Sequence, residues 1–481
     1  MNSTEVYEKE LAFQADRRRA AVQFIKTVSD LWYDKSIELV LFRNQLIDRN
    51  VSDILNLHEY AGEFVEKPIS IFDSVEIAQA IKNLDLPPAK LDIGKLTYEY
   101  HLEDGRLNAT AFVSNKLKDA RKYEEVTPKD VVLYGFGRIG RLLARELMTR
   151  TGKGSQMRLR AIVTRGKIDE KVLEKRASLL KSDSVHGDFS GTVSINAKKN
   201  SLIINGTTVH MISANNPEEI DYTSYGIQDA LIIDNTGAFR DKEALTRHLS
   251  SKGASKVLLT APGKGVPNIV HGVNHLEHHP DEVSLFSAAS CTTNAITPVL
   301  KAVEDSLGVV KGHLETIHAY TNDQNLVDNM HSKYRRGRAA ALNMVITETG
   351  AGQAVSKALP VFEGKLTSNA IRVPVPNGSL AILNLELKKP TSMEEINSII
   401  KKYALDGNLV EQIKYSLDNE LVSSDIVGSA QPSIYDSNAT IVTQDGKNAV
   451  LYVWYDNEYG YSHQVIRLAK YISKVRRFTY Y

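Results

Sequence analysis

Cysteine is almost absent from this sequence: its 481 residues include a single one, Cys291. One thiol cannot form a disulfide within the chain, which excludes the small secreted folds that depend on a disulfide framework. A chain without internal disulfides suits a reducing compartment, and we therefore expect a cytoplasmic protein.

The sequence also lacks an excess of one charge and a long apolar run. Lys and Arg number 59 against 58 Asp and Glu, a formal net charge of +1. This balance gives no reason to expect nucleic acid or an anionic membrane as a partner. No apolar run approaches the ~20 residues that span a bilayer. The first residues, MNSTEVYEKELAFQADRRRA, have no apolar core of a secretory signal, and their acidic residues argue against a transit peptide.

The length predicts two or three domains, and the first, residues 1–127, is expected to be a mostly helical extension. Gly and Pro are nearly missing from Glu5 to about Ile47, and apolar residues recur there at helical spacing. A second helix, VEIAQAIKNL, is expected to be capped by Asp73 or Ser74 and ended by the two prolines that follow. No catalytic constellation is present, which favours a helical layer that packs on the body or on another subunit.

After residue 128 the pattern changes to strands alternating with helices. Apolar runs such as AIVT, ALIID and KVLL alternate with helical patterns up to residue 289, which predicts a parallel sheet with helical crossovers. Residues 290–457 contain longer strands that indicate a mixed sheet. A last helix, within about residues 458–481, is expected to complete the first of these domains.

A glycine-rich turn lies between the first strand and the first helix of this region. Its residues fit the G-x-G-x-x-G dinucleotide fingerprint in its strand–turn–helix context: Gly135, Phe136, Gly137, Arg138, Ile139 and Gly140. The glycines allow the tight turn, the approach of backbone to a pyrophosphate and close helix–strand packing. The fold is therefore expected to be α/β, a Rossmann-type doubly wound parallel sheet plus an α+β catalytic domain. A plain strand–helix turn is the alternative.

The end of the second strand bears on the choice of cofactor. An acidic residue that binds the ribose 2′-hydroxyl is expected there, but AIVTRGKID places Arg165 at this position. Arginine can bind a 2′-phosphate through two charge-assisted hydrogen bonds. The sequence therefore favours NADP over NAD. The alternative is that Arg165 faces solvent and Asp169, or no residue, contacts the ribose.

The lone cysteine stands in the segment SAASCTTN, where a strand ends and a helix begins. The partial positive charge of a helix N-terminus favours a thiolate at Cys291. Pro298 lies within this helix and is expected to cost a backbone hydrogen bond or to bend the axis. A small buried core residue is the alternative for a single cysteine.

Several motifs then follow in order: SCTTN, HAYTND, RRGRAA, TG, IRVPVPN and WYDNEYGYSH. In this order and spacing, the chain from about Asp130 to its C-terminus resembles the phosphorylating glyceraldehyde-3-phosphate dehydrogenase family. Residues 1–127 have no counterpart in the usual family pattern. The resemblance implies a homotetramer that acts on glyceraldehyde 3-phosphate and inorganic phosphate.

The resemblance also implies roles for individual residues. Cys291 would attack the aldehyde as a thiolate, and His318 would pair with it and take the hydroxyl proton as hydride leaves. Two anion sites would be built from Thr321, Asp323, Arg336 and Arg372, and from Ser290, Thr292, Thr349 and Gly350 with Arg372 nearby. Asn457 would bind the nicotinamide carboxamide with Tyr461 behind it, and the cofactor would be lined by Thr236, Gly237, Phe239 and Thr260.

The sequence departs from the family pattern at a few positions. Tyr134 and Asn235 replace the usual Asn and Ser, and Ala295 stands where many members have a second cysteine. Asp328-Asn329 replaces the Leu-Pro of NAD-specific members. Losing Leu-Pro agrees with a 2′-phosphate, but Asp328 would repel one if it faced the same pocket.

Three other interpretations remain open. Erythrose-4-phosphate dehydrogenase is a near relative that lacks the TND and TG pattern, so Thr321-Asn322-Asp323 and Thr349-Gly350 favour the phosphorylating enzyme. A second is a scaffold without activity, and a third is an active enzyme regulated through residues 1–127. No metal site is expected, because His275, His278 and His279 are accompanied by no acidic or thiol ligand.

Overall fold

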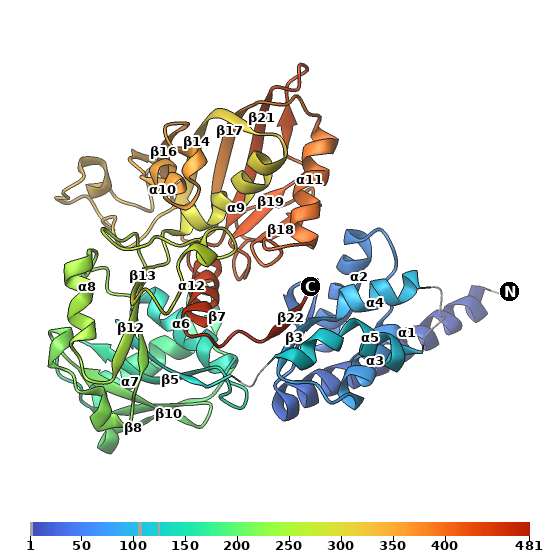
Figure 1. The fold of residues 1–481 in the computed structure, drawn as a ribbon, viewed down its shortest axis with the longest axis horizontal. Helices are drawn as coiled ribbons and strands as arrows, with labels where there is room; N and C mark the ends of the chain where they lie inside the picture. Colours follow the sequence, from blue (N-terminus) through green and yellow to red (C-terminus); the bar gives the residue numbers. More distant parts are fainter. Residues whose placement is uncertain (1–2, 104–107, 124–125) are drawn as a thin grey trace. The chain divides into compact units, whose positions relative to one another are not determined.

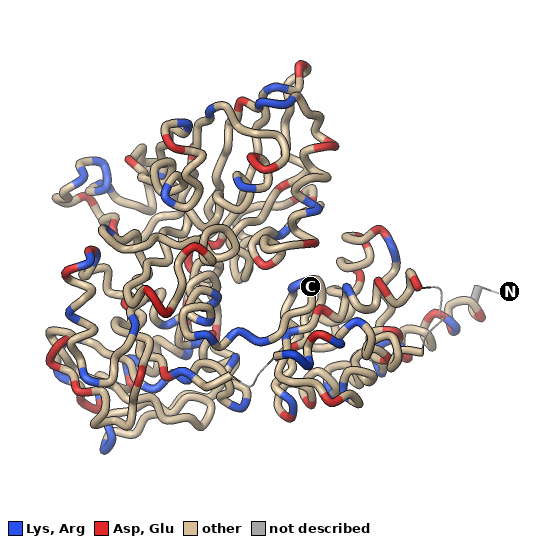
Figure 2. The backbone as a smooth tube through the Cα atoms, in the orientation of Figure 1, with Lys and Arg blue, Asp and Glu red and all other residues tan. Residues whose placement is uncertain are grey.

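The computed structural model describes residues 3–103, 108–123 and 126–481. The chain divides into two compact units, which Figure 1 shows as a ribbon. The N-terminal unit comprises residues 1–127, 151–156 and 475–481, and the larger unit comprises residues 128–150 and 157–474. Figure 2 shows Lys and Arg interspersed with Asp and Glu along both units, in keeping with the net charge of +1.

The N-terminal unit combines helices with a small sheet. Its helices are α1 (Ser3–Lys35), α2 (Val51–Phe64), α3 (Ile71–Asn83), α4 (Ile93–Leu102) and α5 (Ala109–Lys116). Its four-stranded sheet has the order β2-β1-β3-β22, from β1 (Glu38–Leu41), β2 (Asn44–Gln45), β3 (Ala89–Asp92) and β22 (Phe478–Tyr480). The mostly helical character predicted for this part of the chain is confirmed.

Two local predictions for this unit were wrong. The first helix ends at Lys35 instead of continuing to about Ile47, because the run ELVL forms a strand that is buried on both faces. Phe42 and Arg43, both at positive φ, then turn the chain back into β2. The cap of α3 is Ser70, whose Oγ accepts the Phe72 N–H at 3.1 Å, and Ser74 is buried inside the helix.

The larger unit contains the predicted doubly wound sheet. Its strand order is β13-β12-β11-β4-β5-β10-β9-β8. The pairs from β13 to β10 are parallel, and the last two are antiparallel. The strands are β4 (Lys129–Tyr134), β5 (Met157–Thr164), β8 (Val193–Asn196), β9 (Ser201–Ile204), β10 (Thr207–Ser213), β11 (Ala230–Asp234), β12 (Ala254–Leu259) and β13 (Leu285–Ser287); the helices are α6 (Arg138–Thr149), α7 (Glu170–Lys181) and α8 (Lys242–Leu249). β6 (Ser182–Asp183) and β7 (Gly187–Asp188) form a separate hairpin.

The second sheet of this unit is mixed, as predicted. Its order is β15-β16-β14-β17-β21-β19-β18, and β20 also pairs with β21. The strands are β14 (Val309–Ala319), β15 (Val345–Thr347), β16 (Leu366–Val373), β17 (Ser379–Leu387), β18 (Ile413–Ser416), β19 (Ser433–Asp436), β20 (Ile441–Val442) and β21 (Asn448–Tyr455); the helices are α9 (Cys291–Ser306), α10 (Ala351–Ala358) and α11 (Met393–Leu405). The helix α9 packs against this sheet and starts at the cysteine.

The C-terminal end of the chain differs from the prediction. Helix α12 (Tyr459–Ile472) packs against α6 beside the first sheet, as expected for a completing helix. Residues 475–481 instead belong to the N-terminal unit, where β22 pairs in parallel with β3. Arg477 fixes this end: it donates to the Ser36 carbonyl at 2.6 Å and to Glu38 Oε2 at 3.1 Å. The dinucleotide-binding domain is therefore completed by α12 and not by the residues after it.

Within the described residues, no helix has both the length and the apolar character needed to cross a bilayer.

Candidate active site

The cysteine occupies the first turn of α9. Ser290 is the N-cap, and its Oγ accepts the Thr293 N–H at 3.1 Å, so the helix begins with Cys291 itself. Ala289, just before the cap, has a positive φ of 54°, which turns the chain from β13 into the helix. Pro298 stays inside the helix. This placement at the end of a strand and the start of a helix is the one expected from the sequence.

Strand register brings a histidine and an arginine to the cysteine. His318 in β14 lies opposite Arg372 in the parallel neighbour β16. His318 Nε2 is 3.6 Å from Cys291 Sγ. The Ala319 carbonyl lies 2.7 Å from His318 Nδ1 and 2.9 Å from Arg372 Nη1, so it can accept a hydrogen bond from each. With its proton on Nδ1, the imidazole presents the Nε2 lone pair to the thiol.

Burial and the nearby cation decide which charge states this pair favours. Burial raises the pKa of the Cys291 thiol, and Arg372 opposes that rise. Burial and Arg372 both lower the pKa of His318, to about 3. The structure therefore favours a neutral thiol beside a neutral imidazole. Burial thus opposes the thiolate expected from the helix N-terminus, whereas Arg372 and the hydrogen bond to Thr292 support it.

Tyr455 is a further residue of this centre, and the sequence reasoning missed it. Its hydroxyl is 3.0 Å from Thr292 Oγ1 and 2.8 Å from Thr316 Oγ1, and its ring meets the His318 ring edge-on. Burial raises its pKa far above the ordinary range, so it stays a neutral hydroxyl. The only available signal was its position two residues before Asn457 in WYDNEYGYSH.

The arginines of the predicted anion sites lie on different elements. Arg336 pairs with Asp323 and donates through Nε to Thr347 Oγ1 at 3.0 Å. Burial would raise the pKa of Asp323, but its hydrogen bond to Arg336 lowers it. Asp323 therefore carries a negative charge and holds the Arg336 guanidinium, a role that suits positioning better than direct contact with an anion.

The remaining predicted anion-site residues fall into three places. Ser290 and Thr292 lie at the start of α9, as its N-cap and in its first turn, with Thr292 Oγ1 at 4.0 Å from Cys291 Sγ. Gly350 is the N-cap of α10, where an added Cβ would meet open space, and Thr349 Oγ1 accepts the Ala351 N–H at 3.3 Å. Thr321 is partly exposed in the turn after β14. A helix start free of side chains is a suitable place for an anion.

The glycine-rich turn has the shape that a dinucleotide requires. Gly135 has a φ of +105°, and a Cβ on Gly140 would lie 2.5 Å from the Gly135 carbonyl oxygen. A Cβ on Gly137 would meet nothing within 4 Å, and this N-cap of α6 makes no side-chain cap hydrogen bond. The tight turn, the close packing and the open helix start match the three glycine roles of the fingerprint. The described residues therefore fit a dinucleotide pyrophosphate at this turn.

Asn457 is oriented by hydrogen bonds that link it through Ser379 to β14. Ser379 Oγ donates to Asn457 Oδ1 at 2.9 Å and accepts the Ala319 N–H at 3.1 Å. The Asn457 amide nitrogen, a donor, is then directed away from Ser379. Tyr461 donates to the Ala289 carbonyl at 2.9 Å. Ser379 was not identified from the sequence, because its contacts come from strands distant along the chain.

The residues predicted to line the cofactor gather at the carboxyl ends of β11 and β12. Asp234 Oδ1 accepts from the Thr236 N–H and hydroxyl, and the Asp234 carbonyl accepts from Thr260. Asp234 Oδ2 is 2.9 Å from His248 Nε2, deep in the core. Gly237 has a positive φ of 68°, and the Phe239 ring meets the Tyr134 ring edge-on. These strand ends are the edge where open α/β sheets bind their ligands.

The residues that bear on cofactor choice are exposed. Arg165 follows directly after β5 and is exposed. Asp169 is occupied as the N-cap of α7, accepting the Val172 N–H at 2.9 Å. Asp328 accepts from Arg338 Nε at 2.8 Å and from the Ala339 N–H at 2.9 Å.

No group of three or more His, Cys, Asp or Glu side chains in the described part of the chain is arranged to hold a metal ion.

Comparison with known proteins gives the same picture for the larger unit. Residues 129–242 match the family model described as glyceraldehyde 3-phosphate dehydrogenase, NAD binding domain. Residues 290–457 match the model described as glyceraldehyde 3-phosphate dehydrogenase, C-terminal domain.

Similar curated proteins fall into two groups by coverage. A glyceraldehyde-3-phosphate dehydrogenase-like protein of Pseudomonas aeruginosa is 49% identical over 450 residues, covering 92% of this chain and 97% of that protein. Glyceraldehyde-3-phosphate dehydrogenase 2 of Nostoc sp. is 40% identical, covering 72% of this chain and 98% of that protein. Glyceraldehyde-3-phosphate dehydrogenase of Geobacillus stearothermophilus is 39% identical, covering 71% of this chain and 98% of that protein. The first match extends well into the N-terminal unit, whereas the other two have the length of the larger unit.

Proposed function

The chain belongs to the glyceraldehyde-3-phosphate dehydrogenase family, and we propose that it catalyses the reversible, NAD(P)-dependent oxidative phosphorylation of glyceraldehyde 3-phosphate to 1,3-bisphosphoglycerate. The observation that carries this proposal is the 3.6 Å approach of Cys291 Sγ to His318 Nε2. Arg372 stands beside both groups, so a nucleophile, a base and a cation meet at one point.

The chemistry follows from these groups. As Sγ attacks the aldehyde carbon, the thiol proton passes to His318 Nε2 and then to the new oxyanion, giving a thiohemiacetal on Cys291. His318 next takes the hydroxyl proton, and the carbon becomes a thioester. When bound, the oxidised nicotinamide accepts the hydride that leaves this carbon. Inorganic phosphate attacks the thioester, Sγ leaves as the thiolate and is protonated, and the acyl phosphate is released.

Two anions must be held during this sequence, the phosphate of the substrate and inorganic phosphate. Arg372 carries a positive charge close to the thiol, and Arg336 is fixed by Asp323 and Thr347. Guanidinium groups suit two-point recognition of phosphate. We assign Thr321, Arg336 and Arg372 to one anion. The hydroxyls of Ser290, Thr292 and Thr349 and the N-terminus of α10 at Gly350 serve the other.

NADP is the preferred cofactor in this proposal, with NAD as the second. Arg165 is exposed at the end of β5, the strand whose end normally carries the acidic ribose ligand. Asp169 is occupied in capping α7, and the Asp328 carboxylate is satisfied by Arg338 and a backbone N–H. Both carboxylates therefore have partners other than a ribose hydroxyl. This leaves Arg165 as the charged residue at the end of β5, which supports a phosphate-binding role for it.

The proposed assembly is a cytoplasmic homotetramer. The loop between β14 and β15 exposes large apolar side chains, which supports its burial against another subunit: Leu326, Val327, Met330, Tyr334, Leu342 and Met344.

Initial-rate kinetics test the reaction. Oxidation of glyceraldehyde 3-phosphate should require phosphate, and Cys291→Ser should abolish turnover but keep dinucleotide binding. One equivalent of iodoacetamide should also abolish turnover, because Cys291 is the only thiol. Substantial turnover by Cys291→Ser would reject the mechanism, and turnover independent of phosphate would indicate simple oxidation to the acid. Erythrose 4-phosphate serves as the comparison substrate.

The cofactor assignment has its own test. A charged hydrogen bond typically contributes about 1.5–3 kcal/mol, so Arg165→Ala should weaken the binding of NADP about 10- to 100-fold and leave the binding of NAD nearly unchanged. Arg165→Asp should reverse the preference, since it adds repulsion of the phosphate. An equal or higher kcat/KM with NAD in the wild type, unaltered by Arg165→Asp, would show that Arg165 is only a surface residue.

A further inference from the structure

The first part of helix α1 projects from the N-terminal unit. Residues 4–14 are exposed, whereas from Ala20 onward one face of the helix is buried. Figure 1 shows this end of α1 extending past the other helices of its unit. We call residues 4–14 the arm. A single helix of this length is marginal in water without a packing partner.

The arm nevertheless carries large apolar side chains. Val6, Tyr7, Leu11 and Phe13 are 41%, 61%, 52% and 55% exposed. Val6 and Phe13 are spaced at seven residues and continue the face on which Phe24 is buried further along α1. Tyr7 and Leu11, spaced at i and i+4, form a second apolar row about 130° around the helix axis from the first. Two apolar rows on an exposed helix indicate a surface that another protein element covers.

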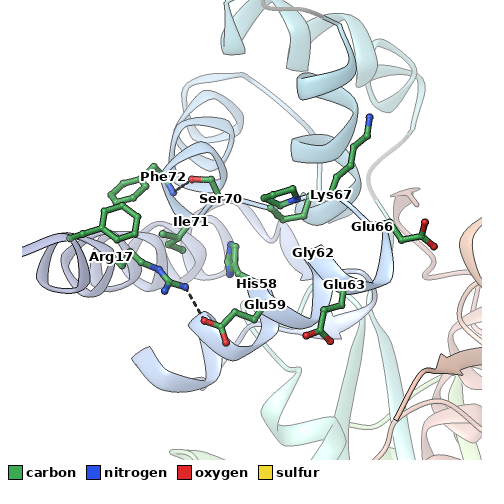
Figure 3. A pocket seen from close by; sticks show the side chains of 13 residues that line it. Arg17, His58, Glu59, Gly62, Glu63, Glu66, Lys67, Ser70, Ile71 and Phe72 are labelled. Carbon is green, nitrogen blue, oxygen red and sulfur yellow. Dashed lines mark hydrogen bonds and ion pairs between the residues drawn. The ribbon is translucent and has the colours of Figure 1, made fainter. Parts of the chain in front are cut away.

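A hollow of ≈ 790 Å³ lies where the arm leaves the unit, and Figure 3 shows the side chains around it. Its floor includes the buried Ile69 and Ile71, and the rings of Phe13 and Phe72 lie 6.2 Å apart at its edge. Next to these rings, one helical turn after Phe13, Arg17 pairs with Glu59 at 3.1 Å. The arm and the hollow are therefore neighbouring parts of one apolar surface.

The buried polar side chain of the hollow, His58, is already engaged. His58 is 3% exposed, its Nδ1 lies 2.7 Å from the Ile54 carbonyl and its Nε2 lies 3.0 Å from Ser74 Oγ. Burial lowers the pKa of His58, so it is neutral at physiological pH. A floor of this kind suits apolar side chains better than a polar metabolite.

Charge along α1 identifies the occupant. The arm contains three acidic residues, Glu5, Glu8 and Glu10, and one basic residue, Lys9. The basic run Arg17-Arg18-Arg19 follows it, and within this run Arg17 pairs with Glu59 and Arg19 with Asp16. Two such helices side by side would repel each other if parallel. If antiparallel, the acidic part of each would face the basic run of the other, which is the self-complementary arrangement of a two-fold interface.

We propose that the arms of two copies of this chain pack antiparallel, and that each arm places Tyr7 and Leu11 against the hollow of the other copy beside Phe13 and Phe72. The interface is a property of the N-terminal unit and does not depend on the proposed reaction. It joins copies either within one assembly of the catalytic bodies or between two assemblies.

Cross-linking of the full-length chain tests this arrangement. Gln14 lies between the two apolar rows, and Cys291→Ser removes the only native thiol, so Gln14→Cys provides one reactive site. A short bismaleimide should convert most of this protein into covalent dimers. As a matched control, Thr246→Cys in the same Cys291→Ser background, at an exposed position of α8 in the larger unit, should give several-fold less covalent dimer. Leu11→Asp added to the Gln14→Cys chain should reduce the dimer several-fold.

Charge reversal separates the antiparallel pair from other modes of association. Glu5→Lys with Glu10→Lys, or Arg18→Glu with Arg19→Glu, should each suppress cross-linking. Co-expression of the two reversed chains should restore it between unlike copies, a rescue that fraying of the helix would not produce. Absence of cross-linking in the parent chain, cross-linking to an unrelated protein, or no rescue between the reversed chains would each overturn the proposal.

Discussion

We predict that the positive charge of Arg372 contributes to the low pKa of His318. Arg372 Nη1 lies 2.9 Å from His318 Nδ1, and burial together with this cation lowers the pKa of His318 to about 3. The pKa of His318 thus lies about 3.5 units below its ordinary value of 6.5, and burial is the largest cause of this difference. Arg372 supplies the smaller part of the difference, so we expect Arg372→Gln to raise the pKa of His318 by about 1 to 2 units.

The measurement is an NMR titration of isotopically labelled histidine. Cys291→Ser is used as the parent so that the thiol does not titrate with the imidazole, and His318→Gln identifies the signal. Arg336→Gln is the matched control, since Arg336 is only a minor influence on His318 and is neutralised by Asp323. Addition of inorganic phosphate to the parent should also raise the pKa of His318, because a bound dianion offsets Arg372. An identical His318 titration in the Arg372→Gln and parent proteins would refute this reasoning.

Arg372 also lowers the pKa of the Cys291 thiol, where it favours the charged form, whereas at His318 it disfavours the charged form. Removal of Arg372 should therefore raise the pKa of the thiol as well as that of the imidazole. The two pKa values then move together, and the balance between the neutral pair and the ion pair changes little. Arg372 is thus better suited to holding an anion than to creating the thiolate, and proton transfer between Sγ and Nε2 remains nearly independent of it.

Two other residues give sharp expectations. Tyr455→Phe keeps the ring beside His318 but removes the hydroxyl between Thr292 and Thr316, so the free energy of unfolding should fall by about 1–2 kcal/mol in chemical denaturation; an unchanged unfolding curve would contradict the bridge. Arg477→Leu should leave Glu38 buried without its closest cation and destabilise the N-terminal unit by about 3 kcal/mol, measured as faster proteolysis of that unit; equal cleavage rates in both proteins would show that the ion pair contributes little.

Local features of the active site could be predicted from the sequence. The glycine-rich turn is specified by three glycines with distinct steric roles, and the structure gives Gly135 a positive φ and places Gly140 against its carbonyl. The start of α9 at Cys291 is specified by Ser290, a good N-cap after a short apolar strand. Signals of this kind depend on neighbouring residues, so they can be read from a single segment.

Features that depend on strand register could not be derived in this way. His318 and Arg372 are far apart in the chain and meet only because β14 and β16 pair in parallel with these residues opposite. The antiparallel pairing of β14 with β17 likewise places Ser379 between Ala319 and Asn457. Family resemblance supplied roles for His318, Arg372 and Asn457, but it supplied none for Ser379 or Tyr455. The effect of burial on the pKa of Cys291 could not be predicted from the sequence either, since it depends on how completely the folded chain buries the thiol.

The N-terminal unit shows why an extension defined by sequence alone is incomplete. Its sheet ends in β22, which comes from the C-terminus. Gly152, from the segment after α6, packs against Trp32 so closely that a Cβ added to it would lie 3.1 Å from the Trp32 ring. Three separate stretches of chain therefore build one core, and residues 1–127 cannot complete it without residues 475–481. Deleting residues 1–127 alone would leave the buried Phe478 and Arg477 without the groups that cover them. An experiment on the role of this unit should remove both ends together, so that a loss of activity reports on the unit and not on an exposed C-terminal strand.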